Sequence, residues 1–338
     1  MLKPYIARLV ERKDLSEAEC QEAMGLIMSG KASEAQIAAF LIALRMKGET
    51  VEEITGCARA MRQAATVVPV EGLQVIDTCG TGGDGKGTFN VSTAAALVAA
   101  GAGVPVAKHG NRSVSSTSGS ADVLMALGVK LDVPVEVVAR CIREAGIGFL
   151  FAPMLHPAMK YAIGPRRELG LRTVFNILGP LTNPSGARRQ LMGVFAQELV
   201  QPIADVLLRL GAERAMVVHS ADGMDELSVC DESMVAEVDG GGVRAGRVSP
   251  EEVGVPRSES PDELLVQSAE ESAEAIRNVL AGGPGSRRDI VLLNAGAAIY
   301  IGGKASSLKQ GVLAAAQSVD SGKALGVMQR LVELTNSG

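Results

Sequence analysis

The sequence changes its pattern near residue 72, and this change most constrains the fold. After it, short apolar segments alternate with longer segments of helical periodicity. The short segments are the expected strands, at residues 75–77, 104–107, 191–195 and 215–219. The longer segments are the expected helices, at residues 91–100, 133–145, 198–210, 272–281 and 290–300. Strands that alternate with helices form a largely parallel sheet covered by helices, so the expected fold class is α/β with a mostly parallel central sheet.

Before residue 72 the pattern is helical throughout. Three capping boxes precede apolar residues at helical spacing, and they pair Ser16 with Glu19, Ser33 with Gln36, and Thr50 with Glu53. A capping box supplies partners for backbone N–H groups that the first turn of a helix leaves free. The sequence therefore predicts a small N-terminal helical domain at residues 1–70 and a larger α/β domain at residues 71–338.

The composition argues against several classes of protein. The 338 residues include 39 glycines and carry a formal net charge of −5, so a general basic surface for nucleic acid is not expected. No apolar run approaches the ~18 residues of a membrane span, and the first residues lack the apolar stretch of a signal peptide. The five cysteines are widely spaced and form no C-x-x-C pair, which favours a reduced, cytoplasmic compartment over a disulfide framework or a zinc ribbon.

A glycine-rich loop joins the first expected strand to the helix that follows it. Five of the eight residues from Gly80 to Gly87 are glycine. Backbone N–H groups in such a loop can approach a ligand closely, and the N-terminus of the next helix adds donors and partial positive charge. The loop therefore favours a phosphate ligand over a tight structural turn, which needs only one or two glycines.

Two nucleotide-binding patterns overlap in this loop, and neither is complete. Gly80, Gly82 and Gly85 fit G-x-G-x-x-G, but a dinucleotide site needs an acidic residue ~20 positions later. Residues 85–121 contain no Asp or Glu. The loop also fits the start of a nucleotide P-loop, but Gly87 stands where that pattern requires Ser or Thr. Both patterns therefore fail at the residue that would complete them.

The acid-free stretch is a local positive island in an acidic chain. Its charged groups are Lys86, Lys108 and Arg112, and six of the eight residues 113–120 are Ser or Thr. The run from Lys108 to Arg112 follows an expected strand, where open α/β sheets bind ligands. Cations, hydroxyls and backbone amides together suit a phosphorylated ligand, although a solvated polar loop would have a similar composition.

Two further segments carry candidate binding groups. Asp225 and Glu226 follow the strand expected at residues 215–219 and could hold the hydrated Mg²⁺ that accompanies many phosphorylated substrates. Arg166 could pair with a substrate carboxylate through its bidentate fork. Taken alone, either segment is also compatible with solvated surface.

Six motifs along the chain stand in a recognisable order. They are Gly80-Thr-Gly-Gly-Asp84, Asn90-Val-Ser-Thr93, Lys108-His-Gly-Asn-Arg112, Arg166 before Glu168-Leu-Gly-Leu-Arg-Thr173, Asn176-Ile-Leu-Gly-Pro-Leu-Thr-Asn-Pro184, and Asp225-Glu226. In this order they resemble the anthranilate phosphoribosyltransferase family over nearly the whole chain. The combination is far more specific than any one motif.

The resemblance implies an enzyme of tryptophan biosynthesis that depends on Mg²⁺. Such an enzyme transfers the phosphoribosyl group of phosphoribosyl pyrophosphate (PRPP) to the amine of anthranilate, giving N-(5-phosphoribosyl)anthranilate and pyrophosphate. The resemblance also implies a homodimer whose helical domain takes in helices from about residues 165–185. No general base is expected, because an aromatic amine is already neutral near neutral pH.

The resemblance further implies roles for individual residues. The PRPP site would be lined by Gly80, Gly83, Asp84, Thr88, Asn90, Val91, Ser92, Thr93, Lys108, His109, Gly110, Asn111, Arg112, Ser113, Val114, Ser115, Ser116 and Ser120. Anthranilate would contact Gly80, Asn111 and Arg166, with His109 nearby. Mg²⁺ would be bound by Ser92, Asp225 and Glu226.

Two other functions remain as alternatives. A pyrimidine nucleoside phosphorylase shares the fold and the glycine-rich phosphate loop, but it would not need the metal pair Asp225 and Glu226. A nucleic-acid-binding relative of the same fold would have lost catalysis, and the basic surface it requires is not evident in this acidic chain.

Overall fold

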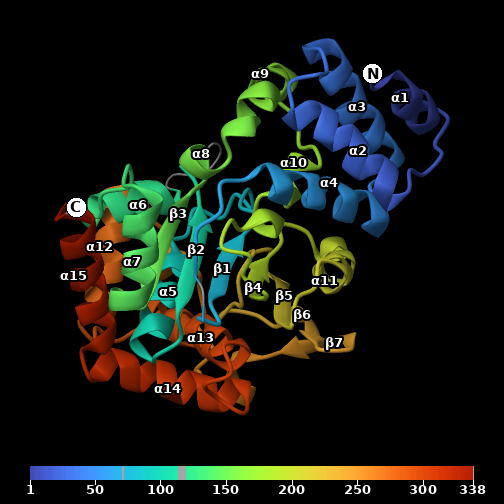
Figure 1. Ribbon diagram of the computed structural model, residues 1–338. Helices are drawn as coiled ribbons and strands as arrows, with labels where there is room; N and C mark the ends of the chain where they lie inside the picture. Colours follow the sequence, from blue (N-terminus) through green and yellow to red (C-terminus); the bar gives the residue numbers. More distant parts are fainter. Residues whose placement is uncertain (71, 113–118, 338) are drawn as a thin grey trace.

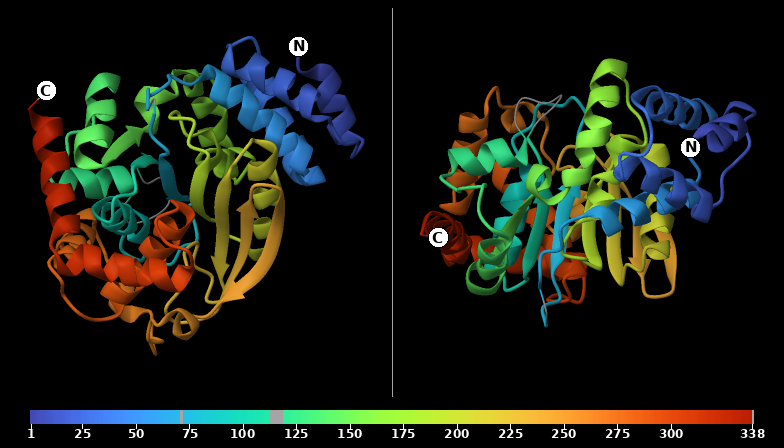
Figure 2. Two further views of the ribbon diagram at one scale, coloured as in Figure 1. Left: turned by 60° about the horizontal axis from the view of Figure 1, so that its bottom comes forward. Right: turned by 45° about the horizontal axis from the view of Figure 1, so that its top comes forward.

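The chain folds into a helical bundle beside a larger α/β body, as the computed structural model in Figure 1 shows. The structure describes residues 1–70, 72–112 and 119–337. The bundle and the C-terminal helices lie at opposite sides of the molecule in each view of Figures 1 and 2. The expected combination of a small helical part with an α/β part is confirmed.

The bundle begins with four helices whose N-termini are capped as the sequence predicts. They are α1 (Lys3–Val10), α2 (Glu17–Met28), α3 (Glu34–Lys47) and α4 (Val51–Ala64). Ser16 and Thr50 form reciprocal capping boxes at α2 and α4. The Ser33 hydroxyl accepts a hydrogen bond from the backbone N–H of Gln36 at the start of α3.

Three helices from the middle of the chain lie near this bundle. They are α8 (Ala152–Leu155), α9 (Lys160–Leu169) and α10 (Phe175–Leu178). Helix α9 packs against α2 and α3, and α10 contacts α4. In Figure 1, α9 stands between the bundle and the α/β body. The chain therefore returns to the bundle after it has built the first three strands.

One seven-stranded sheet forms the centre of the α/β body, in the order β3-β2-β1-β4-β5-β6-β7. The strands are β1 (Ile76–Gly80), β2 (Val106–Gly110), β3 (Ile147–Phe151), β4 (Arg189–Gly193), β5 (Arg214–Ser220), β6 (Ser233–Asp239) and β7 (Gly242–Val248). Strands β1 to β5 pair in parallel, whereas β6 and β7 add an antiparallel hairpin at one edge. The expected mostly parallel sheet is confirmed.

Helices cover both faces of the sheet. They are α5 (Val91–Gly101), α6 (Ser120–Ala126), α7 (Val135–Ala145), α11 (Val200–Arg209), α12 (Ala269–Leu280), α13 (Ser286–Ile301), α14 (Leu308–Asp320) and α15 (Lys323–Asn336). Five short 3-10 helices complete the described secondary structure: Pro157–Met159, Pro180–Thr182, Gln197–Leu199, Pro250–Val253 and Asp262–Leu264. None of the described helices is both long enough and apolar enough to cross a bilayer.

Small residues bring the central helices close together. Helix α5 is rich in alanine and almost wholly buried. Gly296 of α13 and Gly311 of α14 allow the two backbones to touch, since a Cβ at Gly311 would lie 2.1 Å from the Gly296 carbonyl oxygen. Part of the glycine excess therefore serves helix packing, and α13 is held rigidly under the sheet.

Candidate active site

The carboxyl ends of the parallel strands bring the predicted motifs to one edge of the sheet. Gly80 at the end of β1 is in register with Gly193 at the end of β4. The loop that follows β5 crosses the end of β4, where a Cβ at Gly193 would lie only 1.5 Å from the Asp225 backbone oxygen. Glycine at this position therefore lets the acidic loop reach across β4 to the glycine-rich loop after β1.

The contact between these two loops is direct. The backbone N–H of Gly82 donates to Asp225 Oδ2 at 2.9 Å. A Cβ at Gly80 would lie 2.4 Å from the same oxygen, so only glycine allows this approach. Asp84 belongs to the same group, because its Oδ2 accepts the Asp225 N–H at 3.5 Å. The structure thus joins the predicted residues Gly80 and Asp84 to Asp225, which lies more than 140 positions later in the chain.

The glycine-rich loop has a second reason for its composition. Gly82, Gly83, Gly85 and Gly87 have φ between 64° and 77°, a region that other residues rarely adopt. The end of the loop is fixed by Thr88, which forms an isolated antiparallel bridge with Leu265. The backbone path of the loop therefore requires glycine at these four positions.

Three carboxyl groups face one another at this point. Burial, followed by the charge of Asp84, raises the pKa of Asp225 to about 7. Burial, followed by the charge of Asp225, raises the pKa of Glu226 well above its usual value. Carboxylates held together in this way cost free energy unless a cation compensates them.

This donor set fits a hydrated Mg²⁺. Carboxylate oxygens are its preferred protein ligands, and it usually keeps several waters or substrate oxygens. Among the described residues, no three His, Cys, Asp or Glu side chains form a complete metal site. A cation here would therefore share its coordination between the carboxylates and oxygens from water or substrate.

A buried lysine and a helix N-terminus lie beside the carboxylates. Lys108 is 1% exposed, and its Nζ donates to the Thr78 carbonyl at 2.5 Å and to Ser92 Oγ at 3.2 Å. Burial lowers the pKa of Lys108, while the charges of Asp77 and Glu226 oppose that shift. The charge of Lys108 and the backbone of Ser92, in the first turn of α5, oppose the rise in the pKa of Glu226. Positive and negative elements therefore meet at the start of α5.

Comparisons with known proteins agree with this architecture. Residues 3–65 match the model of a glycosyl transferase family, helical bundle domain, and residues 72–325 match that of its a/b domain. The anthranilate phosphoribosyltransferase of Acetivibrio thermocellus is 54% identical over 337 residues, which is 100% of this chain and 97% of the relative. That of Geobacter sp. is 53% identical over 350 residues, which cover 99% of each chain.

Two solved structures have the same fold. The crystal structure of anthranilate phosphoribosyltransferase from Thermus thermophilus has a TM-score of 0.92 and 47% identity, and covers 98% of this chain and 99% of its own. The enzyme from Saccharomyces cerevisiae in complex with PRPP and Mg has a TM-score of 0.90 and 27% identity, and covers 100% of this chain and 98% of its own. This chain belongs to the anthranilate phosphoribosyltransferase family.

In this anthranilate phosphoribosyltransferase family member, Asn90 acts as the cap of α5. Its Oδ1 accepts the backbone N–H of Thr93 at 3.1 Å, and its own N–H donates to Ser272 Oγ at 2.9 Å. Val91 is the first residue of the helix and is buried. The Thr93 hydroxyl is buried and has no hydrogen-bond partner among the residues that the structure describes. The motif therefore orients the helix N-terminus, where backbone donors remain available to an anion.

A second cluster of polar side chains lies at β1 and β2, and the sequence analysis predicted only part of it. The backbone N–H of His109 donates to Asp77 Oδ1 at 3.1 Å. Asn183 donates to Asp77 Oδ2 at 2.7 Å and to the Ala107 carbonyl at 2.8 Å. The Nε2 atoms of His109 and His156 lie 3.2 Å apart. His156 was not among the expected site residues, and no local motif marks it.

Burial keeps both histidines neutral. It lowers the pKa of His109 to about 3, with the neighbouring His156 as the next cause, and the pKa of His156 to about 4. Both side chains therefore present uncharged rings where anthranilate was expected to bind. A neutral ring suits an aromatic ligand, whereas a buried imidazolium would need a counter-charge.

Arg166 is a half-buried cation without an acidic partner among the described residues. Its guanidinium lies over the Phe175 ring, 5.0 Å from the centroid, and burial lowers its pKa. Nearby, Arg172 stacks on Phe195 at 4.3 Å and donates to the Gly83 carbonyl, which links this segment to the glycine-rich loop. Arg166 is therefore free to pair with an anion from outside the chain.

The loop after β2 holds the remaining expected residues. Gly110 needs its lack of a side chain, since a Cβ there would lie 2.2 Å from Ser120 Oγ. The Asn111 carbonyl accepts the backbone N–H of Ala121 at 3.2 Å, which closes this loop. Arg112 is exposed and lines a cavity of about 460 Å³ beside α6. Ser113, Val114, Ser115 and Ser116 lie outside the described residues.

Proposed function

We propose that this chain transfers the phosphoribosyl group of PRPP to the amine of anthranilate. The products are N-(5-phosphoribosyl)anthranilate and pyrophosphate, and the reaction belongs to tryptophan biosynthesis. The observation that carries the proposal is the meeting of Asp225 with the N–H of Gly82, beside Lys108 and the start of α5. Relatives with the same fold have been solved with PRPP and Mg, and with 4-fluoroanthranilate.

The chain's own groups would bind the diphosphate of PRPP. Backbone N–H groups of the glycine-rich loop and of the first turn of α5 can donate to phosphate oxygens. Lys108 holds the Ser92 hydroxyl and adds positive charge behind it. These groups would stabilise the negative charge that grows on the leaving pyrophosphate as its bond to the ribose breaks. When bound by Asp225, Glu226 and Ser92, Mg²⁺ would add further positive charge there.

Other residues would hold the acceptor. Arg166 would pair with the anthranilate carboxylate, and this contact would aim the amine at C1 of the ribose. Asn111 and Gly80 would contact the same substrate, and the neutral rings of His109 and His156 would lie near it. We assign no general base, because the attacking amine carries no proton that must be removed before bond formation.

An assay of anthranilate fluorescence tests the proposal. Fluorescence should fall only when PRPP and Mg²⁺ are both present, because the transfer consumes anthranilate. The phosphorylase alternative instead predicts phosphate-dependent cleavage of a pyrimidine nucleoside without a need for Mg²⁺. The nucleic-acid-binding alternative predicts a DNA complex that weakens with salt. Either of the last two results without loss of anthranilate would reject the proposal.

We further propose a cytoplasmic homodimer whose helical domain comprises residues 1–70 with helices from about residues 165–185, beside an α/β domain at residues 71–338. The packing of α9 on α2 and α3 supports this division.

The exposed apolar side chains of Val10, Met46 and Ile163, on α1, α3 and α9, support association of two copies through the bundle. All five cysteines are free, in keeping with a reducing compartment. Sedimentation would test the dimer.

A further inference from the structure

The acidic loop between β5 and β6 is anchored from inside the protein by one residue of α13. Asn294 is fully buried in the middle of that helix. Its Nδ2 donates to the Leu227 carbonyl at 2.9 Å, and its Oδ1 accepts the Leu227 N–H at 3.0 Å. A single side chain therefore satisfies both backbone polar groups of the residue that directly follows Glu226.

Asparagine is an energetically unfavourable residue in the middle of a buried helix. It has low helix propensity, and its amide must find partners when it is buried. Asn294 meets this need with a third hydrogen bond, from Nδ2 to the Ile290 carbonyl at 2.9 Å within its own helix. The helix itself is fixed, because Gly296 contacts the backbone of α14 closely. The anchor is therefore attached to a rigid element.

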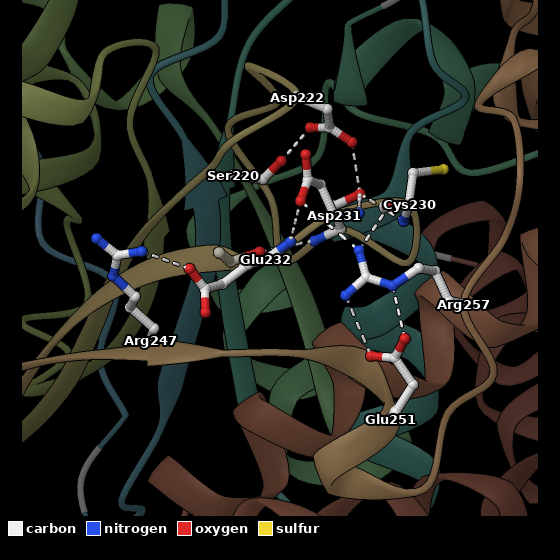
Figure 3. A network of polar contacts seen from close by, with 10 residues as sticks. Ser220, Asp222, Cys230, Asp231, Glu232, Arg247, Glu251 and Arg257 are labelled. Carbon is white, nitrogen blue, oxygen red and sulfur yellow. Dashed lines mark hydrogen bonds and ion pairs between the residues drawn. The ribbon is translucent and has the colours of Figure 1, made fainter.

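A second set of contacts joins the two ends of this loop, and Figure 3 labels Ser220, Asp222 and Cys230 among its members. Asp222 accepts hydrogen bonds from the hydroxyls of Ser220 and Ser228, the latter at 2.6 Å. The Ser228 hydroxyl in turn accepts the Cys230 N–H at 2.8 Å. Asp225 and Glu226 thus lie on a short segment that is held at both ends.

We propose that Asn294 is a positioning residue for Asp225 and Glu226. By fixing the backbone of Leu227, it aims the two carboxylates at the glycine-rich loop and at the first turn of α5. The inference rests on the proposed function, because it assigns the carboxylates to the Mg²⁺ that accompanies PRPP. Groups that orient the ligands of a metal typically change its affinity about 10- to 100-fold when they are removed.

Three variants of Asn294 test its positioning role, and we expect them to destabilise the fold to different degrees. Asn294→Leu keeps the approximate volume and removes all three hydrogen bonds. Asn294→Ala removes them but leaves room for water. Asn294→Asp keeps an acceptor for the Leu227 N–H and loses the donor to its carbonyl. The matched control is Thr335→Val on α15, because buried Thr335 also holds the backbone N–H of a loop residue, Lys130, at 3.3 Å.

The measurement is calorimetric PRPP binding over a series of MgCl₂ concentrations, without anthranilate and therefore without turnover. The half-saturating Mg²⁺ concentration should rise about 10-fold or more in the Leu and Ala variants and less in the Asp variant. Thr335→Val should lower the melting temperature and leave that concentration unchanged.

The outcomes separate the inference from the proposed function. If the wild-type chain does not bind PRPP with Mg²⁺, the proposed function fails. If it binds and the folded Asn294 variants have the Mg²⁺ dependence of the wild type, the positioning role is overturned and the function stands. If none of the three variants folds, Asn294 is a stability residue of the core, and the positioning role is likewise overturned.

Discussion

Two polar clusters, one buried and one half-buried, lie near the same strand ends and differ in how their charges are compensated. The paired cluster consists of Asp77, His109, His156 and Asn183, and its members hydrogen-bond to one another or to nearby backbone. The acidic cluster consists of Asp84, Asp225 and Glu226, in which burial and then the neighbouring carboxyl groups raise the pKa values of Asp225 and Glu226. Lys108 opposes the shift at Glu226, but none of the three carboxyl groups forms an ion pair with a cation among the described residues.

This difference distinguishes polar groups that stabilise the fold from polar groups that await a ligand. A buried group whose partners come from the protein stabilises the fold, whereas a buried group opposed by like charges destabilises it until a ligand binds. The paired cluster should therefore govern stability at acidic pH. The acidic cluster should govern activity and should make the ligand-free protein less stable than it could be.

The largest expected effect comes from Asp225→Asn, which removes one charge from the acidic cluster. Activity should fall about 100-fold or more, because transition-state stabilisation by a metal ion is worth several kcal/mol. Without ligand, however, the variant should be more stable than the wild type at about pH 8, by on the order of 2–4 kcal/mol. Steady-state kinetics and chemical denaturation measure the two effects.

The pH dependence of that stability gain provides the control. The folded pKa of Asp225 is about 7, above that of an ordinary carboxyl, so the folded wild type takes up a proton first as the pH falls. Its stability then rises, and the advantage of the Asn variant should shrink below about pH 7 and vanish near pH 4. Saturating Mg²⁺ and PRPP should abolish the advantage as well. A variant that is less stable than the wild type at every pH would refute the contrast between the clusters.

Arg166 extends the comparison to a cation for which the described part of the chain offers no partner of opposite charge. Arg166→Ala should raise the KM for anthranilate on the order of 10- to 100-fold, as expected for a lost hydrogen bond to a charged group. The KM for PRPP should change far less. The neighbouring Arg167 is exposed, and Arg167→Ala is the matched control that should leave both constants unchanged. Equal effects of Arg166→Ala on both substrates would reject the anchoring role.

The sequence predicted the fold class, the capped helices of the bundle and the motifs of the acidic cluster. It placed the end of β1 too early, at residue 77, because Thr78, Cys79 and Gly80 resemble the start of the loop although they pair in register with β4. It also missed β3, a five-residue strand that follows α7 after a single glycine. Short strands next to a helix carry little periodicity of their own.

The contacts that complete the site could not be predicted, because they join distant segments. Gly193 is identifiable only from the Asp225 backbone that crosses it, and Asn294 only from the Leu227 backbone that it holds. His156 lies 47 residues from His109 and belongs to no expected motif. Local patterns thus indicated candidate residues for the chemistry, whereas the contacts that position these candidates required the structure.

The two histidines of the paired cluster should have a pH dependence opposite to that of Asp225. In the folded chain the pKa of His109 is about 3 and that of His156 is about 4, both below the usual value of 6.5. The unfolded chain therefore takes up protons first as the pH falls. At about pH 5 this should cost up to about 2 kcal/mol of unfolding free energy for each histidine. His156→Gln should therefore reduce the loss of stability between about pH 7 and pH 5 by roughly half. Denaturation of both proteins at the two pH values measures it, and an unchanged loss would show that the histidines are not held neutral.

The smallest expected effect sets the baseline for a polar group that belongs to neither cluster. Ser16 is exposed, and its hydroxyl accepts the Glu19 N–H at 3.3 Å at the start of α2. Ser16→Ala should cost about 1 kcal/mol of unfolding free energy, because the N–H loses its capping partner. Ser29 at the other end of the same helix donates its hydroxyl to the Gly25 carbonyl, and Ser29→Ala should cost less, since that carbonyl keeps the backbone N–H of residue 29 as a partner. Neither variant should change the KM values or the dependence of stability on pH between about 5 and 8. A pH-dependent effect of Ser16→Ala would mean that the bundle is coupled to the clusters at the strand ends. The pH dependence of the unfolding free energy could then not be assigned to the two clusters alone.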